Sequence, residues 1–514
     1  MTLERKPPPE AQIKPSEQSS IRDPDEDAGA SCYGFVALSE TERQLAVQAA
    51  RSTIRKGTAN KTSKRSRLPE PEKHRWFDGW LRAKEAGGLR RLVERTIQLL
   101  EHHEEHTKAR DRARRPDDQK AHLLRIEAIV CNLTYAVLEP PPTGKIATKL
   151  GNGNKGLTRY ESKVLGKMMR PTVLMLECLD ILAVHKPKAI RGEVYSIVPT
   201  AWFRDRVQEF GITKDDFTRD AAEEVLILRR SVKEDTDWAS GSAPRKTREP
   251  INYTETGETR KLRDGMRCLN GFLAAADIAF LDDGLEPRVD PFERTSKRRF
   301  VILEGQPEGF DQGGRLYGGF WQNLKSDRRQ HIRIGGEPVA VLDYGSMFTR
   351  LAYFEAGAVP PEGDLYAIPG TEGYRSGIKL AMNCFLFDGG NRSKWPKELG
   401  VGVGTDLDAE SDPSNEAASY EGGLPAGWTV GKTKKAILAV HPALKAAWGR
   451  RMGYRLMYKE SEVLIAVLET LRTRNIPALG LHDGLIVAQS KAKEAEAVMI
   501  EKAVEVGGGH IPVN

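Results

Sequence analysis

Two isolated aspartates, each at the end of an apolar strand, constrain this sequence more than any other feature. GEPVAVLDYGS predicts a strand over 339–342 that delivers Asp343 at its end, and NIPALGLHDGLIVAQS predicts a hairpin with strands at 476–481 and 485–488 and Asp483 in its turn. If these strands are neighbours in one sheet, the two carboxylates lie side by side and repel each other unless a cation lies between them. A pair of divalent ions about 3.5–4 Å apart supports in-line phosphoryl displacement, and Mg²⁺ suits a site of few carboxylates. The sequence therefore predicts a metal-dependent phosphoryl-transfer site.

A cationic helix is predicted between the two aspartates. YRSGIKLAMNCFLF places Arg375, Lys379, Asn383 and Phe387 four residues apart on one helix face. Two cations can neutralise the phosphates of a nucleoside triphosphate, while an aromatic ring packs against a base. Taken alone, a strand-end Asp more often caps a turn, and an Arg/Lys pair more often lies on a solvated face. The order and spacing of all three segments favour nucleotide chemistry.

These segments resemble the motifs of a known polymerase family. DYGSMFTR, RSGIKLAMNCFLF and LHDGLIV are similar to D-Y-x-x-x-E-x-R, R-x-x-x-K-x-x-x-[FY]-x-x-x-Y-G and H-D-[ES] of family-A DNA polymerases and phage-type single-subunit RNA polymerases. Upstream, GGRLYGGFWQNL resembles the T-G-R-L…L-Q-N segment of that family. It also looks like a group of bacterial and phage proteins with GGRxYGGWWQ followed by an Asp-Tyr/Phe motif. The resemblance covers residues 298–514 and implies an α+β fold: a right-hand polymerase palm, an antiparallel sheet with helices, and helical fingers at about 351–435.

The resemblance also implies roles for single residues. Asp343 and Asp483 would ligate two Mg²⁺ ions, with Mn²⁺ as a possible substitute. Arg375 and Lys379 would hold an incoming deoxynucleoside triphosphate, and Phe387 would lie beside the nascent base pair. The implied primer–template and palm residues are His482 near the primer terminus, Arg315 and Gln322 on the duplex, and Arg350 as an organiser of the palm.

Four positions depart from the family pattern. Phe348 stands where the DNA polymerases have Glu and the RNA polymerases have Gly, and its ring should exclude a ribose hydroxyl. Asn383 replaces an aromatic residue at a helix position tied to the sugar 3′ position. Phe387-Asp388 replaces Tyr-Gly, and Gly484 replaces an acidic residue or Ser. Because no metal ligand is lost, we expect activity to survive these changes.

The remaining chain predicts a mostly α N-terminal half. Residues 1–36 have the composition of a disordered tail, and 37–120 form a basic helical region. Within the latter, residues 51–120 hold 20 Lys/Arg against 11 Asp/Glu, a local +9 in a chain of net charge +7. Residues 216–297 are predicted to be helical, as a thumb or connector. A mobile acidic surface loop is expected at about 400–427.

Residues 121–215 predict a winged-helix-like module. A helix, a short helix, a helix over 171–185 and a basic hairpin follow one another, which is the order of that motif. The hairpin cations Lys186, Lys188 and Arg191 are the candidate phosphate contacts.

Composition indicates where in the cell the protein is expected. No apolar run approaches the ~20 residues that span a bilayer, so no membrane partner is expected. The five cysteines are far apart and lack a CxxC pair, which fits buried thiols in a reducing cytosol. The resemblance implies a bacterial nucleoid or a phage or mobile-element context for this cytoplasmic protein.

The leading interpretation is a template-dependent nucleotidyltransferase, specifically a DNA polymerase that extends a primer on DNA or a DNA/RNA hybrid. Two alternatives stay open. One is an RNA polymerase or primase on the same fold, against which the Phe348 ring argues. The other is a non-catalytic winged-helix DNA-binding regulator with a degenerate palm.

Overall fold

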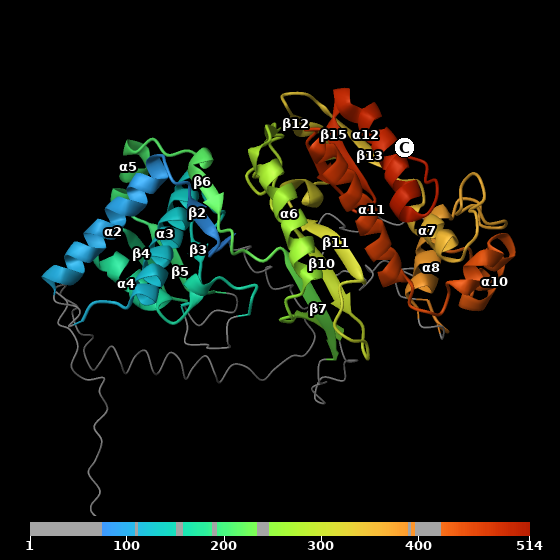
Figure 1. Cartoon of the computed structure of the whole chain (residues 1–514), viewed down its shortest axis with the longest axis horizontal. Helices are drawn as coiled ribbons and strands as arrows, with labels where there is room; N and C mark the ends of the chain where they lie inside the picture. The colour runs from blue at the N-terminus through green and yellow to red at the C-terminus, as the bar shows by residue number, and fades with distance from the viewer. Residues whose placement is uncertain are drawn as a thin grey trace, which may run out of the picture. The chain divides into compact units, whose positions relative to one another are not determined.

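The computed structural model describes residues 75–107, 112–150, 158–187, 193–233, 246–388, 392–395 and 423–514. The predicted tail, residues 37–74 of the predicted basic helical region and most of the acidic loop lie outside these residues, as do Lys188 and Arg191. The described residues fall within one compact unit, Pro71–Asn514. Helices and several small sheets are mixed along it (Figure 1).

Residues 75–106 begin with strands where the sequence predicts helix. RWFDGWLRA forms β1 (Arg75–Trp76) and β2 (Leu81–Ala83), and only then does α2 (Gly88–His106) start. The helix cannot start earlier because Gly87 has a positive φ of 115°. The helix α3 (Pro116–Leu138) follows as predicted, with Pro116 at its first turn.

The region predicted to be winged-helix-like contributes three strands to a four-stranded sheet of order β1-β3-β5-β4, in which β1 pairs in parallel with β3. After α3 come β3 (Ile146–Ala147), the 3₁₀ turn η1 (Lys163–Leu165), α4 (Met169–Cys178), β4 (Leu182–His185), β5 (Ser196–Pro199) and α5 (Ala201–Glu209). The strand β5 pairs antiparallel with both β3 and β4. The predicted helix over 171–185 is wrong in its second half, because Asp180 turns the chain with a positive φ of 54° and 182–185 becomes β4.

The prediction that residues 216–297 are helical is wrong. They contain β6 (Phe217–Arg219), β7 (Leu226–Lys233), β8 (Lys246–Pro250) and β9 (Ile278–Phe280), with α6 (Gly257–Ala275) as the one long helix in the described part of this stretch. With β10 (Ser296–Ile302) and β11 (Gly313–Gly318), β7 and β8 build a four-stranded sheet in the order β11-β10-β7-β8. Leu226 and Leu228 of β7, together with Val225 just before the strand, place their apolar side chains in the main core.

A three-stranded antiparallel sheet carries the two aspartates. Its order is β13 (Val339–Asp343), β15 (Gly484–Ala488) and β14 (Ala478–Gly480), within two residues of the predicted strand bounds. The C-terminal residues extend it, since Asp343 and Asn514 exchange two backbone hydrogen bonds of 3.2 and 2.9 Å. Around it lie α7 (Met347–Glu355), α8 (Arg375–Phe387), α10 (Val430–Val440), α11 (Gly453–Thr473) and α12 (Ala492–Lys502).

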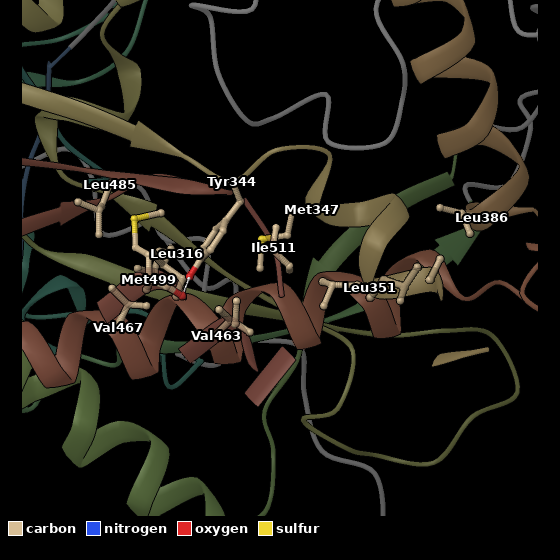
Figure 2. Packing of buried hydrophobic residues seen from close by; sticks show 14 of the residues in the cluster. Leu316, Tyr344, Met347, Leu351, Leu386, Val463, Val467, Leu485, Met499 and Ile511 are labelled. Carbon is tan, nitrogen blue, oxygen red and sulfur yellow. Dashed lines mark hydrogen bonds between the residues drawn. The ribbon is translucent and has the colours of Figure 1, made fainter. Parts of the chain in front are cut away.

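The core fixes this sheet against α11 and α12. Figure 2 shows Tyr344, directly after β13, inserted among apolar side chains, with its hydroxyl donating to the Met499 carbonyl at 2.7 Å. Val463 and Val467 of α11 are fully buried in the same cluster. The residue after Asp343 is therefore an anchor, which holds the end of β13 in place.

The structure modifies two expectations drawn from composition: the absence of a membrane-spanning apolar run and the burial of all cysteines. The helix α3 is long and apolar enough to cross a membrane, but 72 % of its apolar window is buried inside the fold, as in the core helix of a soluble protein. Of the described cysteines, Cys131 and Cys384 are buried as predicted, whereas Cys178 and Cys268 are exposed.

Candidate active site

The two aspartates meet at the joined ends of β13 and β15. Asp343 is in register with Gly484, the residue after Asp483, and the Tyr344 amide donates to the Asp483 carbonyl at 2.8 Å. Asp343 keeps contact with solvent, yet partial burial raises its pKa, and the Asp483 carboxylate raises that pKa further. The predicted pairing of the strands is confirmed, and the two carboxylates repel each other.

This donor set fits a divalent cation of the Mg²⁺ type. Among the described residues, no group of three or more His, Cys, Asp or Glu side chains is arranged to hold a metal ion. An ion at Asp343 and Asp483 would take its other ligands from water and substrate phosphates, which is the habit of Mg²⁺. It would also relieve the repulsion that raises the Asp343 pKa.

Two cations act on the Asp343 carboxylate. Lys379 of α8 is exposed, and its positive charge lowers the pKa of Asp343. Arg329, in the 3₁₀ segment η4 (Ser326–His331), lowers the same pKa. Arg329 was missed by the sequence analysis because it stands in a run of polar and charged residues with no distinguishing spacing.

Arg375, the other predicted triphosphate ligand, has a different partner. Its guanidinium makes two hydrogen bonds to Asp364, of 2.7 and 3.0 Å. The Arg375 side chain is 58 % exposed, so this ion pair is weak and can open at low cost. The structure thus brings Lys379 near Asp343 and leaves Arg375 bound to Asp364.

Phe348 and Phe387, two positions that depart from the family pattern, pack together with Tyr454 in what we call the aromatic unit. Their rings stack with centroids 5.8 Å apart and planes 18° apart, and Tyr454 meets Phe387 edge-on at 5.1 Å. A Cβ at Gly453 would lie 2.4 Å from the Phe387 ring, so this glycine at the start of α11 makes the contact possible. The aromatic unit is therefore fixed by α7, α8 and α11 together.

Arg315 links the aromatic unit to a buried carboxylate. Its guanidinium lies 5.4 Å from the centre of the Phe348 ring and donates to Glu460 at 2.6 Å. Glu460 is 2 % exposed, and burial raises its pKa to about 7, with Arg315 and Lys379 opposing the rise and Asp483 adding to it. The duplex-binding role predicted for Arg315 stays a prediction, and its partner in this structure is Glu460.

Glu460 is the main site residue that the sequence analysis missed. It lies in α11 among the buried residues Leu456, Met457, Val463 and Leu464. A carboxylate within the apolar stripe of a helix is the signal that marks it, because such a group is costly to bury without a partner. Its neighbour Ser461 is also buried.

Replacing Glu460 with Gln should change how stability depends on pH. The raised pKa means that, between about pH 4.5 and pH 7, the folded protein retains a proton that the unfolded chain has lost. The free energy of unfolding of the wild type should therefore fall relative to Glu460→Gln as pH rises through this window. Denaturant titrations at a series of pH values measure it, with the exposed Glu258→Gln as control. Parallel pH curves for wild type and Glu460→Gln would contradict the assignment.

Three other predicted residues serve the local backbone or ring packing. Gln322 and Trp321 both donate to the Gly480 carbonyl, at 3.1 and 2.9 Å. The Arg350 side chain donates to the Gly345 carbonyl at 3.0 Å, which steadies the turn after Asp343. His482 lies with its ring 5.7 Å from that of Tyr317.

Asn383 differs from these residues in its hydrogen bonding. Its side-chain oxygen is buried and accepts no hydrogen bond from the described residues. A buried amide oxygen without a donor is costly, so a bound partner that supplies one would be favoured.

The described fold and site thus define a class: a mixed α and β protein with paired carboxylates beside a cationic helix. Neither a scan against models of known protein families nor a search of curated proteins finds a match to the chain. The functional argument therefore rests on the geometry of the site and on the motifs.

Proposed function

We propose that this chain is a template-dependent nucleotidyltransferase, specifically a DNA polymerase that adds deoxynucleotides to a primer 3′-hydroxyl. The observation that carries the proposal is the pair Asp343 and Asp483, held at the joined ends of β13 and β15 with the charge of Lys379 acting on Asp343. Residues 298–514 would form the palm and fingers of a right-hand polymerase fold, with the fingers at about 351–435.

In nucleotidyl transfer the protein itself would form no covalent bond to the substrate. The primer 3′-hydroxyl gives up its proton to water, its oxygen forms a bond to the α-phosphorus, the bond from the α-phosphorus to the oxygen of the β-phosphate breaks, and pyrophosphate leaves. Asp343 and Asp483 would hold Mg²⁺, which when bound lowers the barrier by activating the 3′-hydroxyl and neutralising the leaving group. Lys379 would bind the phosphates, joined by Arg375 once it leaves Asp364. Phe348 and Phe387 would pack against the sugar and base.

The 121–215 region is proposed as a winged-helix-like DNA contact. The order α3, β3, η1, α4, β4, β5 and the pairing of β5 with both β3 and β4 support this. A purely regulatory DNA-binding protein would share this region. It would have no need of the carboxylate pair or of Lys379, so the catalytic proposal is preferred.

Primer extension on DNA and RNA templates, with each nucleotide class and with or without EDTA, tests the proposal. We expect incorporation of deoxynucleotides that stops when EDTA removes the metal and returns when Mg²⁺ is restored. Preference for ribonucleotides would favour the RNA polymerase or primase alternative. Absence of incorporation together with absence of metal-dependent nucleotide binding would favour the regulator.

Phe348→Ala should relax the choice of sugar. Removing the ring takes away the bulk that excludes a 2′-hydroxyl, so the ribonucleotide/deoxynucleotide ratio of kcat/KM should rise about 10- to 100-fold. Phe348→Leu, which keeps most of the bulk, is the control and should shift the ratio far less. Equal ratios in wild type and Phe348→Ala would show that the ring is not the sugar gate.

A further inference from the structure

Two nearby glutamates of α11 each bind an arginine of the four-stranded sheet. Glu460 accepts a hydrogen bond from Arg315 of β11 at 2.6 Å, and Glu462 accepts one from Arg298 of β10 at 2.7 Å. Figure 1 shows α11 running beside β11. Glu460 is buried, whereas Glu462 is partly exposed. Both ion pairs join the same helix to the same sheet, so attachment of the helix does not distinguish their roles.

The two pairs differ in the ring that their arginine contacts. The Arg298 guanidinium lies 4.8 Å from the centre of the Phe300 ring, which belongs to the same strand. The Arg315 guanidinium lies 5.4 Å from the centre of the Phe348 ring, which belongs to α7. Of the two pairs, the one made by Glu460 therefore reaches a residue of the candidate active site.

A glycine sets how closely β11 approaches α11. Gly314, directly before Arg315, has a positive φ of 80°, and a Cβ there would lie 2.8 Å from the Ser461 hydroxyl oxygen. Ser461 directly follows Glu460 in α11. Because the two backbones meet so closely next to the ion pair, the guanidinium of Arg315 has a defined position between Glu460 and the aromatic unit.

The Phe348 ring depends on its neighbours for its position, because it is only partly buried. One neighbour is the Phe387 ring, stacked at 5.8 Å, and another is the Arg315 guanidinium. A cation near an aromatic face is attracted to it, most strongly where water is excluded. Since Glu460 holds that cation, the carboxylate acts on the ring through Arg315.

We propose that Glu460 is a positioning residue for sugar discrimination, which holds Arg315 against Phe348 and so keeps the ring in the place that excludes a ribose 2′-hydroxyl. The inference rests on the proposed function, in which Phe348 selects deoxynucleotides. Without the Glu460 carboxylate, the Arg315 guanidinium would lose a hydrogen-bond partner and would turn toward solvent. The ring would then be less constrained, and a ribose hydroxyl would be tolerated.

Replacing Glu460 with Met tests the proposal, because methionine has a similar length and lacks the carboxylate. The ribonucleotide/deoxynucleotide ratio of kcat/KM should rise about 5- to 30-fold, less than in Phe348→Ala because the ring is still present. Glu460→Gln keeps an acceptor oxygen for Arg315 and should retain most of the discrimination. Glu462→Met is the matched control, because it breaks the neighbouring pair with Arg298, and it should leave the ratio unchanged.

A double-mutant cycle separates positioning from a general loss of structure. In the Phe348→Ala background, Glu460→Met should change the ratio no further, because the ring through which Glu460 acts is gone. Additive effects of the two changes would overturn the proposal, as would a wild-type ratio in folded Glu460→Met. If Glu460→Met does not fold, Glu460→Met/Arg315→Met removes both charges and should raise the ratio in the same way, and a wild-type ratio in that variant would also overturn the proposal.

A readout that needs no catalysis separates this proposal from the proposed function. With 4-fluorophenylalanine at position 348 of the full chain, the fluorine NMR resonance should move in Glu460→Met and stay in place in Glu462→Met. Primer extension by the wild type, with an unmoved resonance and an unchanged ratio in Glu460→Met, would overturn the inference and leave the polymerase standing. A moved resonance in a protein that extends no primer would keep the positioning of Phe348 by Glu460 and overturn both the polymerase and the link to sugar choice.

Discussion

Asp343→Ala and Asp483→Ala should each lower primer extension on the order of 10³-fold or more while leaving duplex affinity nearly unchanged. The reason is the geometry of the pair: Asp343 ends β13, and the Tyr344 amide binds the Asp483 carbonyl across to β15. Neither side chain is in the apolar core, so its loss should not unfold the sheet. Single-turnover extension and duplex anisotropy, run on the same preparations, measure the two effects.

A second readout does not depend on catalysis. Because Asp483 raises the Asp343 pKa, removing the Asp483 carboxylate should lower that pKa. An NMR titration of the Asp343 carboxyl in wild type and Asp483→Ala should show this downward shift. An unchanged Asp343 pKa would mean that the two carboxylates do not interact.

The matched control is Asp282→Ala. Asp282 is exposed, and its ion pair with Arg288, at 3.7 Å, joins two exposed side chains. This variant should extend primers like wild type. Full extension in Asp343→Ala or Asp483→Ala would remove the site from any role in nucleotidyl transfer.

The strands that carry Asp343 and Asp483 were predictable because their signals are local. Each is a short apolar run bounded by turn residues, and the hairpin with His482 and Asp483 closes within its own segment. The prediction that 216–297 is helical failed because β7 pairs in parallel with β10, about 70 residues later in the chain. The local sequence of β7 does not predict that β10 is its partner strand.

The same distinction applies to the site residues. Lys379 was found because spacing on one helix places it, whereas Glu460 depends on Arg315, 145 residues earlier. The pairing of Arg375 with Asp364 also escaped prediction, because an exposed ion pair between a loop and a helix start leaves no pattern in the sequence. The sequence alone therefore did not predict which charged side chains pair with each other in the fold.

The structure explains why position 484 is a glycine, although the sequence comparison suggested only that an acidic residue or Ser is missing there. In the sequence it stands where the family has an acidic residue or Ser. In the structure, a Cβ at this position would lie 2.1 Å from the Asp343 carboxylate oxygen and 2.3 Å from the Leu342 carbonyl. The glycine lets the Asp343 side chain lie directly against β15, beside Asp483.

Gly484→Ala should therefore reduce both activity and stability. The added methyl must displace Asp343 or separate β13 from β15, since Leu342 and Asp343 are backbone-paired across this point. We expect extension to fall about 100-fold or more, and the free energy of unfolding to fall by about 1–3 kcal/mol, as for other overpacked sites. Extension kinetics and denaturant unfolding measure the two effects.

Gly431→Ala in α10 is the control, because a Cβ there meets nothing within 4 Å. Alanine favours helix over glycine, so this variant should be as stable as wild type or more so, by up to about 1 kcal/mol. Wild-type activity and stability in Gly484→Ala would mean that Asp343 does not lie against β15. Lost activity with wild-type stability would instead place the whole effect on the position of the Asp343 carboxylate.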